Sequence, residues 1–188
     1  MPKPPSRHWV DTLIYIVFCH IGWFVCVISA ARGVGWLGVL LTLGALAYHL
    51  WRAQRPFEEA KLLVVAVLLG GIWESFLVWR GLLVYPNGIV IPSLAPYWIL
   101  ALWAQFAVQF NVLFVWLKNR LWLASVLGAI AGPLSFRGGA ALGAVHFPNV
   151  PLALGTLALG WAVLFPALLA LSRRWDGMRD ITATELPA

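Results

Sequence analysis

Six long apolar runs occupy most of the chain and constrain its fold more than any other feature. They cover roughly residues 12–31, 34–51, 62–79, 97–117, 121–136 and 151–171. A helix that crosses a membrane needs ~20 mostly apolar residues, and only the run over 121–136 is clearly shorter than that. The pattern predicts an all-α, polytopic bundle of about six transmembrane helices that forms one domain over residues 1–188.

The composition argues against a soluble fold. Apolar residues make up 62% of the 188 residues and charged residues only 11%, whereas soluble domains carry roughly a quarter charged residues. A compact soluble chain of this size would expose too much apolar surface. The net charge of +6 does not indicate nucleic acid, because the basic residues lie between the apolar runs and not on one face. We expect no nucleic-acid partner.

The charged residues predict the orientation of the bundle. Arg32, Arg80 and Arg137 fall on one side of six crossings, and the other Lys and Arg residues fall on the opposite side. Basic loops remain in the cytoplasm, so both termini are predicted to be cytoplasmic. Lys3 and Arg7 precede the first run as in a signal peptide, but this run exceeds the usual signal core of ~7–15 residues. We therefore expect it to be a retained helix.

The two longer loops on the other side leave their structure open. Pro86, Asn87 and Gly88 form a strong turn signal within residues 81–96. A short hairpin on the membrane surface and a plain linker fit this segment equally well. Residues 137–150 contain glycines and alanines that would also permit a partial re-entrant helix.

Small residues predict one close helix contact. Ala124, Gly128 and Gly132 recur every four residues, and such a stripe lets helices approach closely. It fits packing inside the bundle, and it also fits a homodimer face. Cys19 and Cys26 would lie ~10 Å apart along one helix, which is too far for a disulfide, so we expect them to be apolar packing residues.

Glu74 is the only acidic residue inside a predicted span. An ionisable group within a membrane is costly and is usually functional. Gly70 and Gly71 lie one turn away on the same helix face and leave space beside the carboxyl group. Gln105, in the following predicted span, is expected at nearly the same depth as Glu74. Gln109 follows one helical turn deeper on the same face.

Arg80 and Arg137 end their predicted spans on the outer side, where either could pair with Glu74. Trp73 and Trp103 count to the middle of the membrane, as do two further tryptophans, Trp23 and Trp161. Aromatic walls with a few polar groups are typical of ligand pockets and also of ordinary cores. Two interpretations remain: a buried pair that stabilises the bundle, or a polar site that binds a headgroup or relays a proton.

His20, His49 and Asn111 are predicted at similar depths toward the cytoplasm. Buried histidines that only form hydrogen bonds are common, and no metal-binding spacing accompanies these. We therefore predict no metal ion and no cofactor. His146 falls in the outer loop near Arg137 and is a further candidate for an outer site.

Several short motifs stand out over residues 70–147. They are Trp73-Glu-Ser, Tyr85-Pro-Asn-Gly, Pro96-Tyr-Trp, Ala101-Leu-Trp, Phe110-Asn111 and Gly132-Pro-Leu-Ser-Phe-Arg-Gly-Gly-Ala-Ala-Leu-Gly-Ala144. These motifs resemble those of a family of small bacterial inner-membrane proteins, known only as domain of unknown function 2878, and the resemblance is strongest in this part of the chain.

The resemblance implies a multi-pass protein of the bacterial inner membrane with no established activity. Members of that family are often encoded near lipid-modifying enzymes, which favours lipid handling. The motifs also add Ser135 to the polar residues. The candidate ligand-binding set is therefore Glu74, Gln105, Gln109, Asn111, Ser135, Arg137, Trp73 and Trp103.

Four functions remain open, and no residue is assigned a catalytic role. The first is binding of a membrane lipid or other amphiphile between the helices. The others are a proton-coupled transporter, a lipid-modifying enzyme with Glu74 or His146 as acid or base, and a non-catalytic subunit that binds a partner protein. Phosphate-binding loops and the common hydrolase motifs are missing from the sequence.

Overall fold

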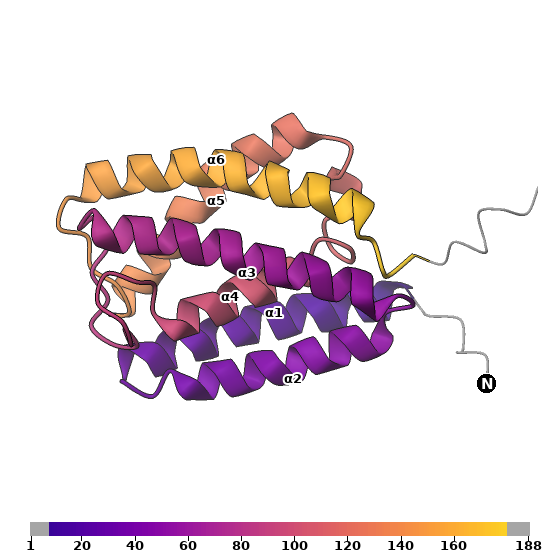
Figure 1. Ribbon diagram of the computed structural model, residues 1–188, viewed down its shortest axis with the longest axis horizontal. Helices are drawn as coiled ribbons and strands as arrows, with labels where there is room; N and C mark the ends of the chain where they lie inside the picture. The colour runs from indigo at the N-terminus through magenta and orange to yellow at the C-terminus, as the bar shows by residue number, and fades with distance from the viewer. Residues whose placement is uncertain (1–7, 180–188) are drawn as a thin grey trace, which may run out of the picture.

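The computed structural model describes residues 8–179, with side chains from residue 12 onward. Within these residues the regular structure consists of α-helices and one short 3-10 helix (Figure 1). They are α1 (His8–Ala31), α2 (Trp36–Arg52), α3 (Pro56–Trp79), α4 (Tyr97–Ala107), η1 (Val115–Leu117), α5 (Leu121–Ala141) and α6 (Val150–Arg174).

The helices run in alternating directions along one axis, so both described ends of the chain lie at the same end of the bundle (Figure 1). We call this the basic end; it contains residues 53–55, 118–120 and 175–179. The opposite end, which we call the loop end, contains residues 32–35, 80–96 and 142–149. This arrangement has the even number of crossings that the charge pattern predicts.

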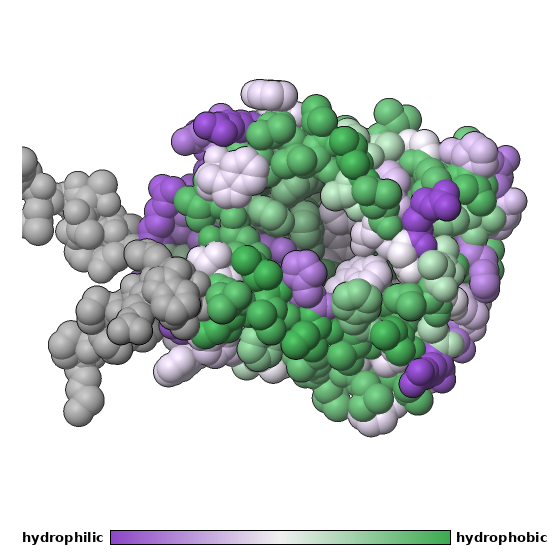
Figure 2. All heavy atoms as spheres, turned by 180° about the vertical axis from the view of Figure 1, so that it is seen from behind, coloured by the Kyte–Doolittle hydropathy of each residue, from purple (hydrophilic) through white to green (hydrophobic). Residues whose placement is uncertain are grey.

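The surface identifies the bundle as a membrane protein. Helices α1, α3, α5 and α6 are each long and apolar enough to cross a bilayer. Helix α2 has 17 residues, or ~26 Å, and extends over most of the bundle (Figure 1). Large side chains such as Leu68 and Leu159 are 58% and 73% exposed on the outer faces. Figure 2 shows mostly apolar side chains across the middle of the rear face, with more polar ones toward both ends.

The fourth predicted span is not one helix. Helix α4 ends at Ala107, and turns followed by η1 replace the rest of the predicted helix 97–117. The backbone turns around the Gln109 carbonyl, which accepts hydrogen bonds from the amides of Val112, Leu113 and Phe114. Non-helical backbone is tolerated at membrane depth when protein surrounds it. Phe110, at the centre of this segment, is fully buried.

Two other predicted spans were shorter than the helices in the structure. Helix α3 begins at Pro56 and not near residue 62, because proline suits the first helical position. Helix α5 continues past residue 136 to Ala141 and ends in a glycine cap, in which Gly143 has a φ of +82°. Residues 137–141 therefore belong to α5, and Arg137 lies inside this helix and not at its end.

The two longer loops at the loop end, which we call the outer loops, pair with each other, and residues 81–96 do not form a hairpin. Val84 and His146 exchange two backbone hydrogen bonds, of 3.0 and 2.8 Å, which join residues 80–96 to residues 142–149. Leu83, Tyr85 and Val145 are buried beneath this bridge. The two loops thus form a packed cap over the loop end.

The small-residue stripe of α5 packs inside the chain. Ala124, Gly128 and Gly132 are all buried. A Cβ atom at Gly132 would lie 2.3 Å from the ring of Trp161 on α6, and one at Gly128 would lie 2.5 Å from the Trp161 carbonyl oxygen. Of the two interpretations of this stripe, the structure therefore shows packing within the bundle.

Candidate functional site

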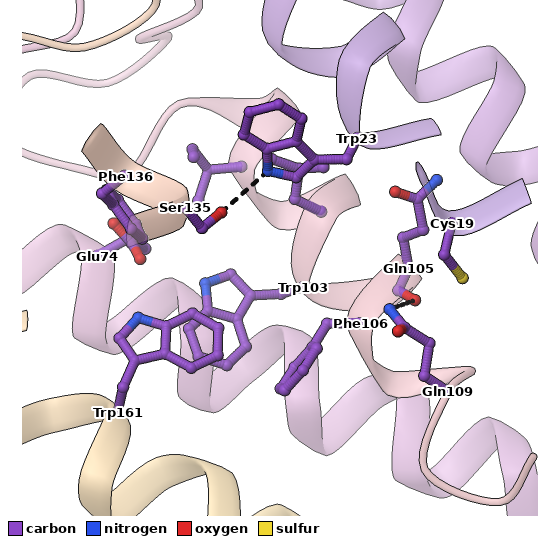
Figure 3. Close-up of a pocket in the computed structure, with 12 residues that line it drawn as sticks. Cys19, Trp23, Glu74, Trp103, Gln105, Phe106, Gln109, Ser135, Phe136 and Trp161 are labelled. Atoms are coloured by element: carbon purple, nitrogen blue, oxygen red, sulfur yellow. Dashed lines mark hydrogen bonds between the residues drawn. The ribbon is translucent and has the colours of Figure 1, made fainter. Parts of the chain in front are cut away.

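A pocket of about 130 Å³ lies inside the bundle, against the broken helix α4. Helices α3 and α6 cover it from the front, while α1 and α5 lie behind, where Figure 2 shows a hollow in the surface. The side of the pocket formed by α1 and α5 is therefore the side that faces the surrounding lipid. Its walls are formed by Cys19, Trp23, Glu74, Ile99, Leu102, Trp103, Gln105, Phe106, Gln109, Ser135, Phe136 and Trp161 (Figure 3).

Glu74 forms one end of this pocket. It lies one and a half turns before the end of α3, or ~7.5 Å from the loop end of that helix, and its side chain is 0% exposed. The Tyr85 hydroxyl donates a hydrogen bond of 3.0 Å to Oε2. The other carboxyl oxygen, Oε1, has no well-aligned hydrogen-bond partner, and the Trp103 indole is the other polar side chain near this carboxyl group. Burying a polar atom without a partner costs ~1–3 kcal/mol, so this oxygen requires an explanation.

The two glutamines lie on the other side of the Trp103 ring from Glu74 (Figure 3). Gln109 Nε2 donates a hydrogen bond of 3.2 Å to the Gln105 carbonyl. Gln105 itself is buried, and its Nε2 has no partner. This amide group lies against Gly22 of α1, where a Cβ atom would come within 1.8 Å of Nε2. The pocket thus has a polar group at each end.

Aromatic rings fill the space between these polar ends. Trp103 stacks on Trp161 with ring centroids 5.0 Å apart, and Phe106 contacts both rings edge to face. Trp103 is seated in a notch at Gly70, where a Cβ atom would lie 2.0 Å from its ring. Such rings give the pocket a firm apolar wall.

Buried polar atoms without partners are concentrated at this pocket. Within residues 12–179, five buried side-chain polar atoms lack a partner. Three of them belong to residues that line the pocket: Glu74 Oε1, Gln105 Nε2 and Trp161 Nε1. Since native proteins satisfy nearly all such atoms, this concentration favours a binding site over ordinary core packing.

A single hydrogen bond closes the side of the pocket that faces lipid. Trp23 Nε1 of α1 donates to Ser135 Oγ of α5 over 3.0 Å (Figure 3). Beyond this bond, the Trp23 ring would come within 3.2 Å of a Cβ atom at Gly138. Helices α1 and α5 therefore meet here through one indole side chain.

Five residues of the predicted set line the pocket: Glu74, Gln105, Gln109, Ser135 and Trp103. Three do not. Trp73 fills a notch at Gly160 of α6, where a Cβ atom would lie 2.1 Å from its ring. Arg137 is exposed on α5, and Asn111 belongs to a separate polar cluster. The role of each residue in binding stays a prediction.

The predicted pairing of Glu74 with an arginine was wrong. Its partner is Tyr85, which the cap formed by the outer loops places above the carboxyl group. Arg80 lies over the ring of Trp79, 5.7 Å from the ring centroid. For Arg137, the described residues provide no ion pair. Burial, followed by the nearby Glu74 carboxylate, raises the pKa of the Tyr85 hydroxyl well above its usual value, so it remains a hydrogen-bond donor.

A second polar cluster, which we call the basic-end network, joins the helices at the basic end. Its members are buried: Tyr15, His49, Glu59, Asn111, Lys118 and Asp176. The Tyr15 hydroxyl contacts His49 Nδ1 at 2.8 Å, and His49 Nε2 contacts Glu59 Oε2 at 2.9 Å. Glu59 Oε1 accepts hydrogen bonds of 2.7 Å from both Asn111 Nδ2 and the Gly177 amide.

Lys118 extends this network to the segment after α6. Its ammonium group donates to the Asn111 side-chain oxygen and to Asp176 Oδ2, the latter over 2.7 Å. Burial lowers the pKa of Lys118, while the bond to Asp176 opposes that shift. Because its buried carboxylates and ammonium group all have partners, the basic-end network is a structural lock between helices.

The predicted grouping of His20 with His49 and Asn111 was wrong for His20. His20 is exposed on α1, where its Nδ1 lies 2.8 Å from the Ile16 carbonyl oxygen. His146 takes part in the loop bridge through its backbone. Over residues 12–179, no three His, Cys, Asp or Glu side chains lie close enough together to hold a metal ion.

Sequence reasoning missed Phe136 in the pocket wall and Tyr85, which bonds to Glu74 from outside the pocket. It also missed Glu59, Lys118 and Asp176 in the network. The turn around Tyr85 was visible in the sequence, but its fold over Glu74 was not. Glu59 appeared to precede the third span, because the count of apolar residues began at residue 62. The proline at position 56, followed by Glu58 and Glu59 within the next three residues, was the available signal of an earlier helix start.

Comparisons with known proteins leave the activity open and establish the family. No curated protein and no solved structure matches this chain. The family described as "Protein of unknown function (DUF2878)" matches residues 12–167, which include all the residues that line the pocket. The chain therefore belongs to this family of uncharacterised function, which is the family that its motifs resemble.

Proposed function

We propose that this membrane protein binds an amphiphile inside the bilayer, with the polar end of the ligand at Glu74. The observation that carries the proposal is the unpartnered Oε1 atom of a fully buried carboxyl group that borders a pocket with aromatic walls. A ligand group that donates a hydrogen bond or carries a positive charge would satisfy this oxygen. A hydroxyl or an ammonium headgroup has this chemistry.

A small movement of the wall is needed for the ligand to reach this oxygen, because Glu74 is fully buried. Trp103 and Trp161 are held by their glycine notches and by each other. Phe136 is the ring on α5 that lines the same pocket, and it makes no contact with another aromatic ring in the described part of the chain. We propose that a rotamer change of Phe136 opens the path to Glu74.

The test compares lipids that remain bound to wild type and to Glu74→Gln after purification in a mild detergent. Native mass spectrometry followed by lipid extraction identifies any bound species. Glu58→Gln is the matched control, since Glu58 is partly exposed and pairs with Lys61 far from the pocket. We expect one specific amphiphile in the wild type and in the control, and its loss in Glu74→Gln. Equal amounts of the same lipids in all three proteins would contradict the proposal.

A second candidate function is transport, favoured by the break in α4. The helix ends at Ala107 beside Gln105 and Gln109, and broken helices at membrane depth form the ion and substrate sites of many transporters. Flux driven by a pH gradient across liposomes, measured for wild type and Glu74→Gln, tests this function. Absence of any Glu74-dependent flux would leave binding as the supported function.

We further propose the bacterial inner membrane as the location, with the basic end in the cytoplasm, as the charge distribution favours. Val90 at the loop end is 77% exposed, and Gln54 at the basic end is also exposed. An impermeant maleimide should label Val90→Cys from outside intact cells, and Gln54→Cys only after lysis. The reverse pattern would contradict this orientation.

A further inference from the structure

A groove along α5, next to the pocket, is not yet used by the proposed function. This groove has a volume of about 320 Å³ and shares Phe106, Ser135 and Trp161 with the pocket. Its other walls are aliphatic and aromatic side chains of η1, α5 and α6. If Phe106 and Trp161 part, pocket and groove join into an apolar channel that ends at a buried carboxyl group, which is the shape expected for a chain with one polar end.

Resting on the proposed function, we infer that the ligand is a single-chain amphiphile with a hydroxyl or ammonium head at Glu74 and its chain along α5. Glu74 lies near the loop end, while the groove extends from Ser135 past Leu127 to Trp116 in η1. Ser135 and Leu127 are ~12 Å apart along α5. The head would thus lie toward the loop end and the chain toward the basic end, which is the orientation of a lipid in the loop-end leaflet.

The width of the channel favours one chain over two. Trp103 fills the notch at Gly70, and Trp161 fills the notch at Gly132, so neither ring can retreat to widen it. Pocket and groove together reach only the lower part of the ~300–1,000 Å³ range of ligand sites. A lipid with two chains would have to leave one of them outside, between α1 and α5.

The residues that line the two cavities favour a ligand headgroup that donates hydrogen bonds over an anionic headgroup. Neither the pocket nor the groove is lined by a Lys or Arg residue. The exposed Arg137 lies outside both cavities. A carboxylate or phosphate head would therefore meet the Glu74 carboxyl group without a cation to balance it.

Native mass spectrometry titrations of the delipidated full chain test this inference with four probes. Hexadecanol and hexadecylamine have one chain and a donor head, dioleoylglycerol has the same hydroxyl on two chains, and octanol is too short to reach far into the groove. The groove is blocked by Ala131→Trp, since Ala131 lines it on α5. Leu134→Trp is the control, because Leu134 is 61% exposed on the same helix and lines neither cavity.

We expect both hexadecyl probes to bind the wild type on the order of ten-fold more tightly than dioleoylglycerol, which is the modest discrimination that a hydrophobic site gives against a group it cannot accommodate. Ala131→Trp should weaken hexadecanol binding by about the same factor, while Leu134→Trp should leave it unchanged. Octanol should bind all three proteins equally. Its retention by Ala131→Trp also shows that this variant is folded.

The two proposals fail in different ways. If no probe binds the wild type, or if Glu74→Gln binds every probe as the wild type does, the proposed function is wrong. If binding depends on Glu74 but dioleoylglycerol matches hexadecanol, the single-chain inference is overturned and the binding function stands. Equal hexadecanol binding by Ala131→Trp and Leu134→Trp would likewise overturn the placement of the chain along α5.

Discussion

Replacing Glu59 by alanine should destabilise the protein more than any other single change in the basic-end network. The Glu59 carboxylate bonds at once to His49 of α2, to Asn111 after α4 and to the Gly177 amide after α6. It is 1% exposed, so water cannot replace these bonds while the chain remains folded. Its removal therefore leaves His49 Nε2 and the Gly177 amide without this partner and takes one of two partners from Asn111 Nδ2.

The magnitude follows from counting the groups that lose their partner. His49 Nε2 and the Gly177 amide lose the bonds recorded above, while Asn111 Nδ2 keeps its bond of 3.0 Å to the Trp175 carbonyl. Each buried unsatisfied group costs ~1–3 kcal/mol, and breaking a buried charged pair costs ~3–5 kcal/mol. We therefore expect Glu59→Ala to lower the free energy of unfolding by ~3–5 kcal/mol.

The neighbouring Glu58 supplies the control. Its carboxylate lies 2.6 Å from the Lys61 ammonium on a partly exposed face, and such pairs contribute ~0–1 kcal/mol. Unfolding by sodium dodecyl sulfate in mixed micelles, followed by circular dichroism, measures both variants. If Glu59→Ala lost no more stability than Glu58→Gln, the basic-end network would not be the lock that we describe.

Three further outcomes can be measured in the same unfolding assay. Tyr85→Phe removes the donor to Glu74 Oε2 and should cost ~1–3 kcal/mol. Because the pKa of Tyr85 is raised on folding, the stability that its proton confers is present below pH ~10 and is lost as the pH rises further. Tyr85→Phe should accordingly show a shallower alkaline decline, and an unchanged decline would refute this assignment. Gly160→Ala should cost ~1–3 kcal/mol, since its Cβ atom would overlap the Trp73 ring, whereas Gly155→Ala, with nothing within 4 Å, should be neutral or stabilising. Equal effects of the two glycine variants on stability would contradict the conclusion that Gly160 makes room for the Trp73 ring.

The apolar runs were sufficient to predict a helical membrane bundle, because length and hydropathy alone decide whether a segment can cross a bilayer. They did not reveal the break after Ala107, since residues 108–117 are as apolar as a helix would be. That break depends on tertiary contacts. Phe110 and Phe114 pack against Phe165, which lies far away in the sequence.

The candidate site was predicted only in part, for a related reason. Depth along a helix can be counted, and this placed Glu74 and Gln105 at similar levels. The direction in which a side chain points around the bundle cannot be counted without knowing the neighbours of each helix. Arg137 was for this reason assigned to the site, although it faces outward, while Tyr85 was not, although it bonds to Glu74.

The basic-end network also has a consequence for biosynthesis. Asp176 and Gly177 follow the six α-helices of residues 8–179, yet they supply partners for Lys118 and Glu59, which come much earlier in the chain. During synthesis these two buried charged groups lack part of their partners until the segment after α6 has left the ribosome. The bundle can insert helix by helix, but it can lock only after the segment behind α6 has been made. Quality-control proteases would therefore meet an unlocked bundle in any product truncated after α6.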